Sequence, residues 1–481
     1  MARWGRSLLL LLLTLPPIAV AVACNAFDSE PPAEVEPERD ASTTTDAPPS
    51  LPEAGGDAGA PKTIAKVVAG TGHACAIFQD GRLKCWGANA SGALGIGTTE
   101  PHGRSPGTMG DALPYVDLGT GRRAVDVVAG GNPARNDAGE ANLLYTCVLL
   151  DDATVKCWGY NGYGNLGRGN TLDIGKGPNQ MGDNLAPVSV GAKVKAIAGG
   201  LYHVCALLED RQVKCWGFNS LGNLGIGDVE HRGNKPGDMG LSLPSVPLGR
   251  PATAIAAGGH QACALLDDGR VTCWGYNLYG GLGLGDTASR GGSPDAGVLA
   301  SANLGESATA IACGWHYACA LLTSGALKCW GYNGYGNLGV GDTTHRGASA
   351  DAGLMGDALP VVDLGKGAPV KSLSLGDFST CALRNDGTAK CFGNNTDGQL
   401  GINDSLNRGG APGSMGDNLP VVGLRGITQL SMGYRSACAI AEGTLRCWGN
   451  NDFGQLGLGD TASRGDKPGD MGGLPAVDLG R

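Results

Sequence analysis

Aromatic residues are scarce in this chain: they make up 5% of its 481 residues, against 84 glycines. A composition this poor in large rings and this rich in glycine does not suit long packed helices. It favours short strands joined by many tight turns. The net charge is −9, and beyond Arg6 the sequence has no long run of Lys or Arg. A surface for nucleic-acid phosphates needs clustered cations, so we expect no nucleic-acid partner.

Several chemical signatures are also missing. No Cys-x-x-Cys occurs, and the histidines do not follow the cysteines at zinc-finger spacing, so we expect no structural zinc site. The glycine-rich stretches are not followed by Gly-Lys-Ser or Gly-Lys-Thr, and His-Glu-x-x-His does not occur. These gaps leave no P-loop and no zinc-protease motif. We therefore expect neither a metal nor another cofactor.

The N-terminus has the pattern of a targeting segment. Arg3 and Arg6 precede an apolar run at residues 8–15, and small residues follow up to Cys24. The run is too short for a spanning helix, and it predicts a signal peptide over residues 1–23. Cys24 stands where the lipobox of bacterial lipoproteins places its lipidated cysteine, although Ala21 replaces the usual Leu. The resemblance implies cleavage before Cys24 and diacylation of its sulfur; an ordinary cleaved secretion signal is the alternative.

Residues 24–61 separate this signal from the rest of the chain. They are rich in Pro, Ala, Asp, Glu, Ser and Thr and contain few large apolar side chains. Such a segment cannot bury enough surface to offset its ordering entropy, so we predict a disordered tether. With a lipid at Cys24, the tether would hold the remaining chain away from a membrane. The expected location is the bacterial cell envelope, facing the periplasm or the cell surface.

One phrase recurs seven times over residues 62–481. Each copy has a strand like Cys-Ala-Leu-Leu, a short polar turn and an ending like Cys-Trp-Gly, as in residues 263–275. A run like Gly-x-Leu-Gly-x-Gly-Asp follows, and then one like Val-Asp-Leu-Gly. The period is about 60 residues, which is typical of propeller blades. Short strands at regular spacing, bounded by Gly and Asp turns, predict an all-β fold with seven blades.

The cysteines give a sharper prediction. Besides Cys24 and Cys313, the 16 cysteines form seven pairs, one pair in each copy. Nine residues separate the members of six pairs, and eight separate Cys438 from Cys447. Nine fit a three-residue hairpin loop and eight fit a two-residue loop, and both place Cys opposite Cys within disulfide range. We predict these cross-strand disulfides in an oxidising compartment: Cys75–Cys85, Cys147–Cys157, Cys205–Cys215, Cys263–Cys273, Cys319–Cys329, Cys381–Cys391 and Cys438–Cys447.

The hairpin loops carry their own signal. A three-residue loop usually ends in a left-handed residue, and four copies place glycine there: Gly81, Gly269, Gly325 and Gly387. Ala153 and Arg211 occupy the same position in two further copies and should be mildly strained. Cys313 lies outside the paired pattern, and we expect it to be a buried small hydrophobic residue.

The copies resemble the regulator of chromosome condensation repeat across nearly all of residues 62–481. The resemblance rests on the Cys-Ala-Leu-Leu strand, the Trp330–Asn333 step and the run from Gly454 to Asp460. It implies a seven-bladed propeller with four-stranded blades. The last copy ends with a Val-Asp-Leu-Gly phrase that does not precede the first copy. We therefore expect the C-terminal strand to complete the first blade and so close the ring, which removes exposed sheet edges.

Variation between copies points to a binding surface. The turns before the first cysteine of each copy should form one rim of the ring, with an insertion at residues 131–145 in the second copy. Turns on a rigid scaffold commonly bind partners, and aromatic and Arg side chains favour contact hot spots. The candidate residues are Tyr202, Trp315, Tyr317, Phe378, Tyr434 and Arg435. The alternative is that these residues only seal the channel mouth.

Other repeated features have simpler interpretations. The six blade tryptophans and Phe392 should pack between blades, and His73, His203, His260 and His316 should have structural roles. The Asp-x-x-x-Arg loops, such as Asp286 to Arg290, suggest local ion pairs. We expect these loops on the rim opposite to the candidate turns.

Three functions follow as hypotheses. The first is a monomeric, surface-tethered protein-binding or scaffold module without catalytic residues. The second is a polysaccharide hydrolase or lyase with carboxylates at the channel mouth. The third is a structural component of the envelope. The namesake repeat proteins are nuclear exchange factors for a small GTPase, so guanine-nucleotide exchange follows from family analogy alone. A fold does not fix a function.

Overall fold

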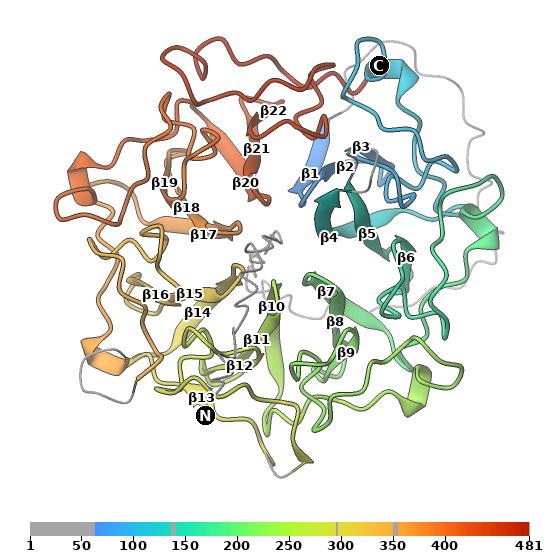
Figure 1. The fold of residues 1–481 in the computed structure, drawn as a ribbon, viewed down its shortest axis with the longest axis horizontal. Coiled ribbons are helices and arrows are strands. Elements are labelled where there is room, and N and C mark those ends of the chain that lie inside the picture. Colours follow the sequence, from blue (N-terminus) through green and yellow to red (C-terminus); the bar gives the residue numbers. More distant parts are fainter. Residues whose placement is uncertain (1–62, 136–140, 295–296, 350–354, 481) are drawn as a thin grey trace, which may run out of the picture.

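A computed structural model describes residues 63–480, with gaps at 136–140, 295–296 and 350–354. The predicted signal peptide, Cys24 and the tether lie outside the described residues. The described chain forms seven antiparallel sheets arranged as the blades of a closed ring (Figure 1). It contains only strands, turns and single turns of 3-10 helix, and it has no helix long and apolar enough to cross a membrane.

Each blade is one copy of the repeat, and its first strand lies nearest the ring axis (Figure 1). The strands, blade by blade, are β1 (Ile64–Ala69), β2 (His73–Phe78) and β3 (Leu83–Gly87); β4 (Ala124–Arg135), β5 (Ala141–Leu150) and β6 (Val155–Gly159); β7 (Val194–Gly199), β8 (His203–Leu208) and β9 (Val213–Gly217); β10 (Ala252–Gly258), β11 (Gln261–Leu266), β12 (Val271–Gly275) and β13 (Ser301–Ala302); β14 (Ala308–Cys313), β15 (Tyr317–Leu322) and β16 (Leu327–Gly331); β17 (Val370–Leu375), β18 (Ser379–Arg384) and β19 (Ala389–Gly393); and β20 (Ile427–Met432), β21 (Ser436–Ala441) and β22 (Thr444–Gly449).

The predicted disulfides are all present. In every blade the second and third strands pair with Cys opposite Cys, and the seven Cα–Cα distances are 4.0–4.1 Å. The loop residues behave as the spacing requires: Gly269 has φ of 79°, and Ala153 and Arg211 adopt the same left-handed conformation at 65° and 66°. The shortened seventh loop uses left-handed Glu442 and Gly443, with φ of 49° and 74°. Cys313 is buried, as expected.

The core lies between neighbouring blades. The six blade tryptophans and Phe392 are completely buried. Each tryptophan also donates its indole N–H to a backbone carbonyl of the preceding copy; Trp158, for example, donates to Ala93 at 2.9 Å. A buried indole N–H needs such an acceptor, so this bond fixes the ring orientation as well as burying a large apolar surface.

The fourth strand of each blade is less regular than the family resemblance implies. Only blade four has an assigned fourth strand, β13, among the described residues. In the other blades a short extended segment joins the third strand through isolated contacts, such as the bond from Val116 N–H to Leu83 O at 2.9 Å. This extended segment belongs to the same copy of the repeat as the third strand with which it pairs, so each blade is formed by one copy.

Ring closure therefore differs from the prediction. Val477 donates its backbone N–H to Leu445 of β22, so the C-terminal phrase completes blade seven rather than blade one. Blade one forms hydrogen bonds with this C-terminal segment: the Lys84 ammonium donates to Leu479 O at 2.8 Å, and Gly110 N–H donates to Asp478 O at 3.0 Å. The indole of Trp86 donates to Gln455 O at 3.0 Å across the same junction. Blades seven and one are therefore joined by the same kinds of contact as the other neighbouring blades. No strand of the described chain is exchanged between them.

Candidate functional site

One face of the ring carries the turns that vary between copies and that the sequence predicted as a binding surface. The first and second strands of a blade meet at this face, and the third strand ends there because it runs antiparallel to the second. The turn before each second strand and the loop after each third strand therefore share one surface, which we call the turn face. Val204, beside the turn of blade three, pairs with Trp216, just before the loop of the same blade.

The Asp-x-x-x-Arg loops also belong to this side of the molecule, and our placement of them on the opposite rim was wrong. His231, inside one such loop, packs against Phe218 and Tyr163, with ring centroids 5.2 and 5.5 Å apart. The loops do contain the predicted ion pairs, as between Arg232 and Asp228 at 2.5 Å. Each ion pair joins two residues of the same loop and so stabilises it, and the loop that contains His231 packs against Phe218 and Tyr163.

The six candidate rim residues are not equally accessible. Trp315, Tyr434 and Arg435 are half-buried, and Tyr202 and Phe378 are buried to within 8% and 7% exposure. Tyr317 is fully buried, which corrects its assignment to the exposed rim. It begins β15 and points toward blade six, where its hydroxyl donates to Ser379 O at 2.9 Å. Tyr145 of blade two makes the equivalent bond to His203 O at 3.0 Å.

A continuous row of rings crosses the turn face from blade two to blade six. At one end, Tyr163 lies 4.9 Å from Tyr202 and 5.0 Å from Phe218 (ring centroids). The row continues through the imidazoles of His260 and His316, which are 6.3 Å apart. We call this set the aromatic row; its members are Tyr160, Tyr163, Tyr202, Phe218, His260, Tyr276, Tyr279, Trp315, His316, Tyr332, Tyr335 and Phe378.

Much of this row comes from the glycine-rich stretches after the blade tryptophans, where the sequence predicted no binding residue. In the step after each blade tryptophan, one variable position holds Tyr160, Phe218, Tyr276 or Tyr332 in blades two to five, but Ala88, Asn394 or Asn450 in the others. Three residues later, copies two, four and five carry Tyr163, Tyr279 and Tyr335, whereas the other copies carry Ser91, Leu221, Asp397 and Phe453. The aromatic side chains at these positions in blades two to five are half-buried. The signal was present as variation at two fixed positions inside an otherwise constant phrase.

Trp315 lies over the turn of the preceding blade. A Cβ added to Gly259 would come within 2.0 Å of the Trp315 Cδ1 atom, so only glycine leaves room for the indole. The same ring stacks on His316 with centroids 4.4 Å apart and meets Phe378 edge-on at 4.9 Å. Trp315 thus joins three consecutive blades, four to six.

The histidines at the base of the row are neutral. Burial lowers the pKa of His203 and His316 to about 3 and that of His260 to about 4. His73 is also buried, its pKa is lowered to about 3 by the same cause, and its Nε2 lies 2.8 Å from Thr146 Oγ1. No group of three or more His, Cys, Asp or Glu side chains in the described residues is arranged to hold a metal ion.

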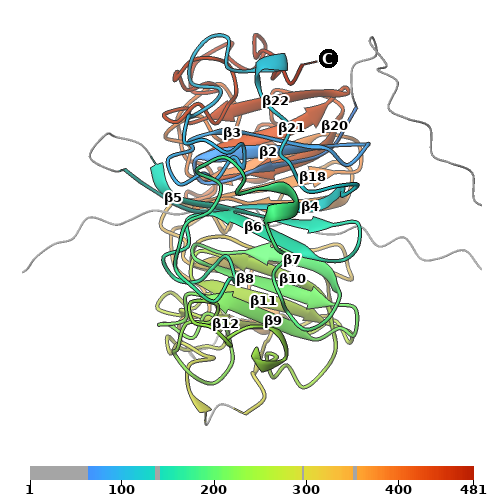
Figure 2. The ribbon, with the colours of Figure 1, turned by 90° about the vertical axis from the view of Figure 1, so that its right-hand side faces the viewer.

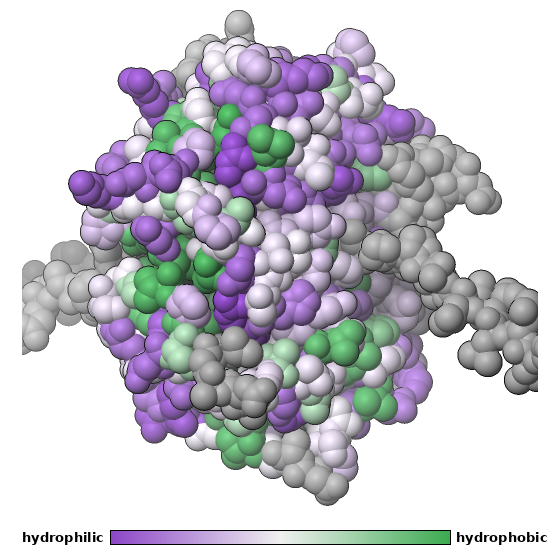
Figure 3. All heavy atoms as spheres, turned by 60° about the vertical axis from the view of Figure 1, so that its left-hand side comes forward, coloured by the Kyte–Doolittle hydropathy of each residue, from purple (hydrophilic) through white to green (hydrophobic). Residues whose placement is uncertain are grey.

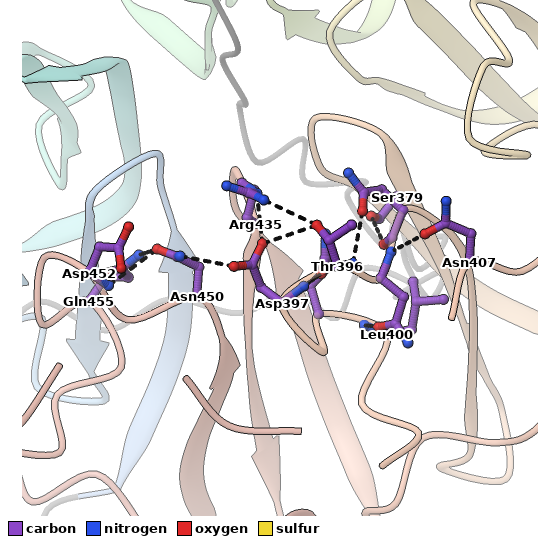
Figure 4. A network of polar contacts seen from close by, with 12 residues as sticks. Ser379, Thr396, Asp397, Leu400, Asn407, Arg435, Asn450, Asp452 and Gln455 are labelled. Atoms are coloured by element: carbon purple, nitrogen blue, oxygen red, sulfur yellow. Dashed lines mark hydrogen bonds and ion pairs between the residues drawn. The ribbon is translucent and has the colours of Figure 1, made fainter. Parts of the chain in front are cut away.

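The junction of blades six and seven presents a polar sector, where the Arg435 guanidinium lies 5.9 Å from the ring centroid of Tyr434. Asp397 occupies the position of Tyr163 and Tyr335, and its carboxylate lies 2.7 Å from Arg435 Nε. The Asn450 amide donates to the other Asp397 oxygen at 3.1 Å, and Arg435 also donates to Thr396 Oγ1 at 3.1 Å (Figure 4). Arg435, proposed from sequence as a contact residue, is therefore held in place by an ion pair between blades.

The insertion in the second copy is an extension of the blade two hairpin. β4 and β5 continue past the sheet, with Gly131 opposite Leu144 and Asn132 opposite Leu143. This extension projects from the ring on one face (Figure 2). Leu143 packs beside Tyr202 and Tyr160, so the hairpin rises next to one end of the aromatic row.

On the side of the ring in Figure 3, hydrophobic and hydrophilic residues form small neighbouring groups rather than one broad apolar patch. Tyrosine is neither strongly hydrophobic nor strongly hydrophilic on that scale, so a tyrosine-rich row is distinguished by its rings. Leu278, between Tyr276 and Tyr279, adds a side chain that is 51% exposed.

A serine-nucleophile spacing, Gly-x-Ser-x-Gly, occurs at residues 103–107. Catalytic serines with this spacing sit on a strand-to-helix elbow. Here the string lies in an irregular loop, Pro106 follows Ser105, and a 3-10 turn at Gly110–Ala112 is the next regular element. The neighbouring His102 uses Nδ1 to contact Thr108 O at 2.7 Å. The Gly-x-Ser-x-Gly motif at residues 103–107 is therefore part of a structural loop and not a nucleophile elbow.

The comparisons with known proteins agree with this architecture. The model of a family described as the RCC1-like domain matches residues 37–408 and 144–478. The ultraviolet-B receptor UVR8 of Arabidopsis thaliana is 28% identical over 418 residues, which cover 84% of this chain and 81% of that protein. Human E3 ubiquitin-protein ligase HERC2 is 29% identical over 331 residues, 68% of this chain but only 6% of that much longer protein.

Solved structures are similar in fold at lower identity. Yeast RCC1 (Prp20), solved bound to Kap60, superposes with a TM-score of 0.58 at 19% identity, covering 86% of this chain and 85% of that chain. Human WBSCR16 superposes with a TM-score of 0.56 at 19% identity, covering 78% and 85%.

Proposed function

The chain belongs to the RCC1-like domain family, and from that premise we propose that it is a protein-binding module held at a cell envelope, with the turn face as its contact surface. The aromatic row carries this proposal. It spans five blades whose framework repeats almost unchanged, so its side chains are not dictated by the fold. Relatives in the family include a receptor and a propeller solved in complex with another protein.

The composition of the turn face suits a protein partner. Tyr, Trp and Arg are the side chains that most often dominate binding energy, and Tyr and Trp bury much area with little loss of conformational freedom. The row supplies half-buried rings that are already fixed by neighbouring rings, such as Tyr332 and Phe378 at 5.0 Å. Pre-ordered rings reduce the entropy that binding must overcome.

The turn face is also asymmetric, which suits a single bound orientation. Aromatic rings occupy blades two to six, whereas the ion pair between Arg435 and Asp397 marks the junction of blades six and seven. The β4–β5 hairpin rises at the opposite end of the row beside Tyr202. A partner with an apolar surface flanked by a polar edge would match this arrangement in one register.

Copy one provides substitutions that the framework tolerates. It carries Ala88 and Ser91 where copy two carries Tyr160 and Tyr163 and copy five carries Tyr332 and Tyr335. We expect the double variants Tyr160→Ala/Tyr163→Ser and Tyr332→Ala/Tyr335→Ser, and separately Trp315→Ala, to fold and to lose the partner. Affinity purification of the tagged domain from envelope extracts, quantified against the unaltered protein, measures this loss.

Arg270→Ala is the matched control, since Arg270 follows the hairpin loop at the opposite end of blade four. It should recover the partner normally. Folded variants of the aromatic row that still recover every protein captured by the unaltered chain would place the binding surface elsewhere. Unfolding of all three variants would instead make the row part of the structural core.

Attachment to the envelope is the second part of this proposal. Its support is the Arg-flanked apolar run before Cys24 and the seven disulfides, which accumulate in exported proteins. A fatty-acid probe should label the unaltered protein and not Cys24→Ser. Absence of label in both proteins would remove the lipid anchor from the proposal and leave simple secretion.

A further inference from the structure

The second copy of the repeat departs from the others at one position. The Gly-x-Leu-Gly-x-Gly run ends in glycine in six copies and in Asn403 in copy six, and the residue before this last position is apolar in six copies: Ile96, Ile226, Leu284, Val340, Ile402 and Leu458. In copy two it is Arg168. The fold evidently accepts an aliphatic side chain here, so the framework does not require an arginine.

Arg168 has no partner within the described part of the chain. It makes no hydrogen bond or ion pair there, and its buried Nε–H faces no acceptor. A guanidinium N–H taken out of water without an acceptor costs free energy. In the five copies with an Asp-x-x-x-Arg loop, the arginine is instead paired, as Arg464 is with Asp460 at 2.6 Å. Copy two has Asn170 and Ile174 at these two loop positions.

Arg168 lines a groove between blades two and three. The groove has a volume of about 320 Å³, and its walls are Ala186, Pro187, Pro236 and Met239. Lys235 is the second charged residue in its lining, so the lining carries two positive charges and no negative one. Lys235 lies 3.8 Å from Glu230, and both side chains are more than 60% exposed. Such an exposed pair is weak, so the ammonium stays available.

The equivalent groove between blades seven and one provides a comparison inside the same molecule. It has the same volume of about 320 Å³, and Pro106 and Met109 correspond to Pro236 and Met239. Its charged lining residues are Asp460, Asp478 and Arg464, with a net charge of −1. Leu458 takes the place of Arg168, and Asp478 takes the place of Ser189. The groove between blades two and three has Arg168 and Lys235 and lacks counterparts of Asp460, Asp478 and Arg464, so its lining is positive where the other is negative. The whole chain has a net charge of −9.

We propose that the groove between blades two and three binds a carboxylate of an acidic peptide segment in a partner protein. The planar guanidinium of Arg168 presents paired donors that match a carboxylate, and Lys235 adds a point charge. The proline, alanine and methionine walls suit the apolar residues beside such a carboxylate. A groove of this volume accommodates a few residues of an extended peptide. The site is separate from the aromatic row and does not rest on the function proposed for it.

The test uses the full-length protein and a fluorescein-labelled peptide with two glutamates flanking a proline. A second peptide has glutamine at both positions. Fluorescence anisotropy should show binding of the glutamate peptide that weakens with salt, and no binding of the glutamine peptide. Arg168→Leu installs the side chain of copy seven and should weaken binding about tenfold or more. Its thermal stability should be unchanged or higher, because a buried unpaired donor has been removed.

Lys467 is the matched control for Lys235. Both lysines precede Pro-Gly-Asp-Met in the same phrase, but Lys467 lies beside the copy six groove, where Ile402 replaces Arg168. Lys235→Ala should weaken peptide binding and Lys467→Ala should not. Equal binding by Arg168→Leu and the unaltered protein would overturn the proposal, as would equal losses in the two lysine variants. Displacement of the peptide by inorganic phosphate at concentrations where acetate has no effect would also overturn it.

Discussion

A buried lysine joins neighbouring blades, and its removal gives a quantitative test of the fold. Lys156 lies on β6 and is 5% exposed. Its ammonium donates to Leu118 O at 2.9 Å and to Gly182 O at 2.8 Å, which connects the end of copy one to blade two. Burial lowers the pKa of this ammonium, and nearby Asp183 and Asp117 oppose that effect.

Lys156→Met keeps the aliphatic stem and removes the donor. Gly182 O keeps its bond from Leu185 N–H, whereas no other described group donates to Leu118 O. An orphaned buried carbonyl costs about 1–3 kcal/mol, and the lost bond to Gly182 O costs about 1 kcal/mol more. Relief of the desolvated charge offsets part of this loss. We expect the free energy of unfolding to fall by about 2 kcal/mol.

Lys390→Met gives a graded comparison. Lys390 makes one such bond, to Gly416 O at 2.7 Å, and that carbonyl keeps a second donor, Leu419 N–H. The loss should be about 1 kcal/mol. Lys195→Met, at an exposed position on β7, should change stability by less than about 0.5 kcal/mol. Urea unfolding under non-reducing conditions, followed by the fluorescence of the buried tryptophans, measures all three variants. Equal stability of Lys156→Met and Lys195→Met would refute the reasoning.

Three further predictions follow. Non-reducing peptide mapping should link Cys438 to Cys447, and replacing both with serine should cost about 2–3 kcal/mol by the chain-entropy relation for so short a loop; free thiols at these positions would contradict the assignment. Ala153→Gly and Arg211→Gly relieve left-handed φ angles of 65° and 66° and should each raise stability in urea by about 0.5–1 kcal/mol, whereas a loss would show that these side chains pack usefully. Burial lowers the pKa of His203 and His316 to about 3 from 6.5, so the unfolded chain takes up protons first. These two histidines should not lower the free energy of unfolding above pH 6.5. The free energy of unfolding should fall as the pH drops from 6.5 toward 3, by up to about 1.4 kcal/mol per pH unit for each histidine. His203→Gln should flatten this slope, and a pH-independent stability would contradict the assignment.

Local geometry explains what the sequence determined by itself. The hairpins and the seven disulfides depend on residues fewer than a dozen positions apart, and strand parity alone places Cys opposite Cys. The blade count follows from the number of repeat copies. The same reasoning identified the strained loop positions Ala153 and Arg211, because a three-residue hairpin needs a left-handed third residue. These features need no knowledge of neighbouring blades.

Contacts between blades decided the rest. Tyr317 was taken for a rim residue because it follows a turn, yet packing against blade six buries it and satisfies its hydroxyl at Ser379 O. The C-terminal Val-Asp-Leu-Gly sequence resembles the segment at the end of other copies, and only its hydrogen bond to β22 assigned it to blade seven. The aromatic row is likewise assembled from side chains about 60 residues apart, such as Tyr279 and Tyr332, whose rings meet only because adjacent blades pack side by side. Sequence spacing fixes what lies within a blade, whereas the packing angle between blades, which no single copy encodes, fixes which surfaces they form together.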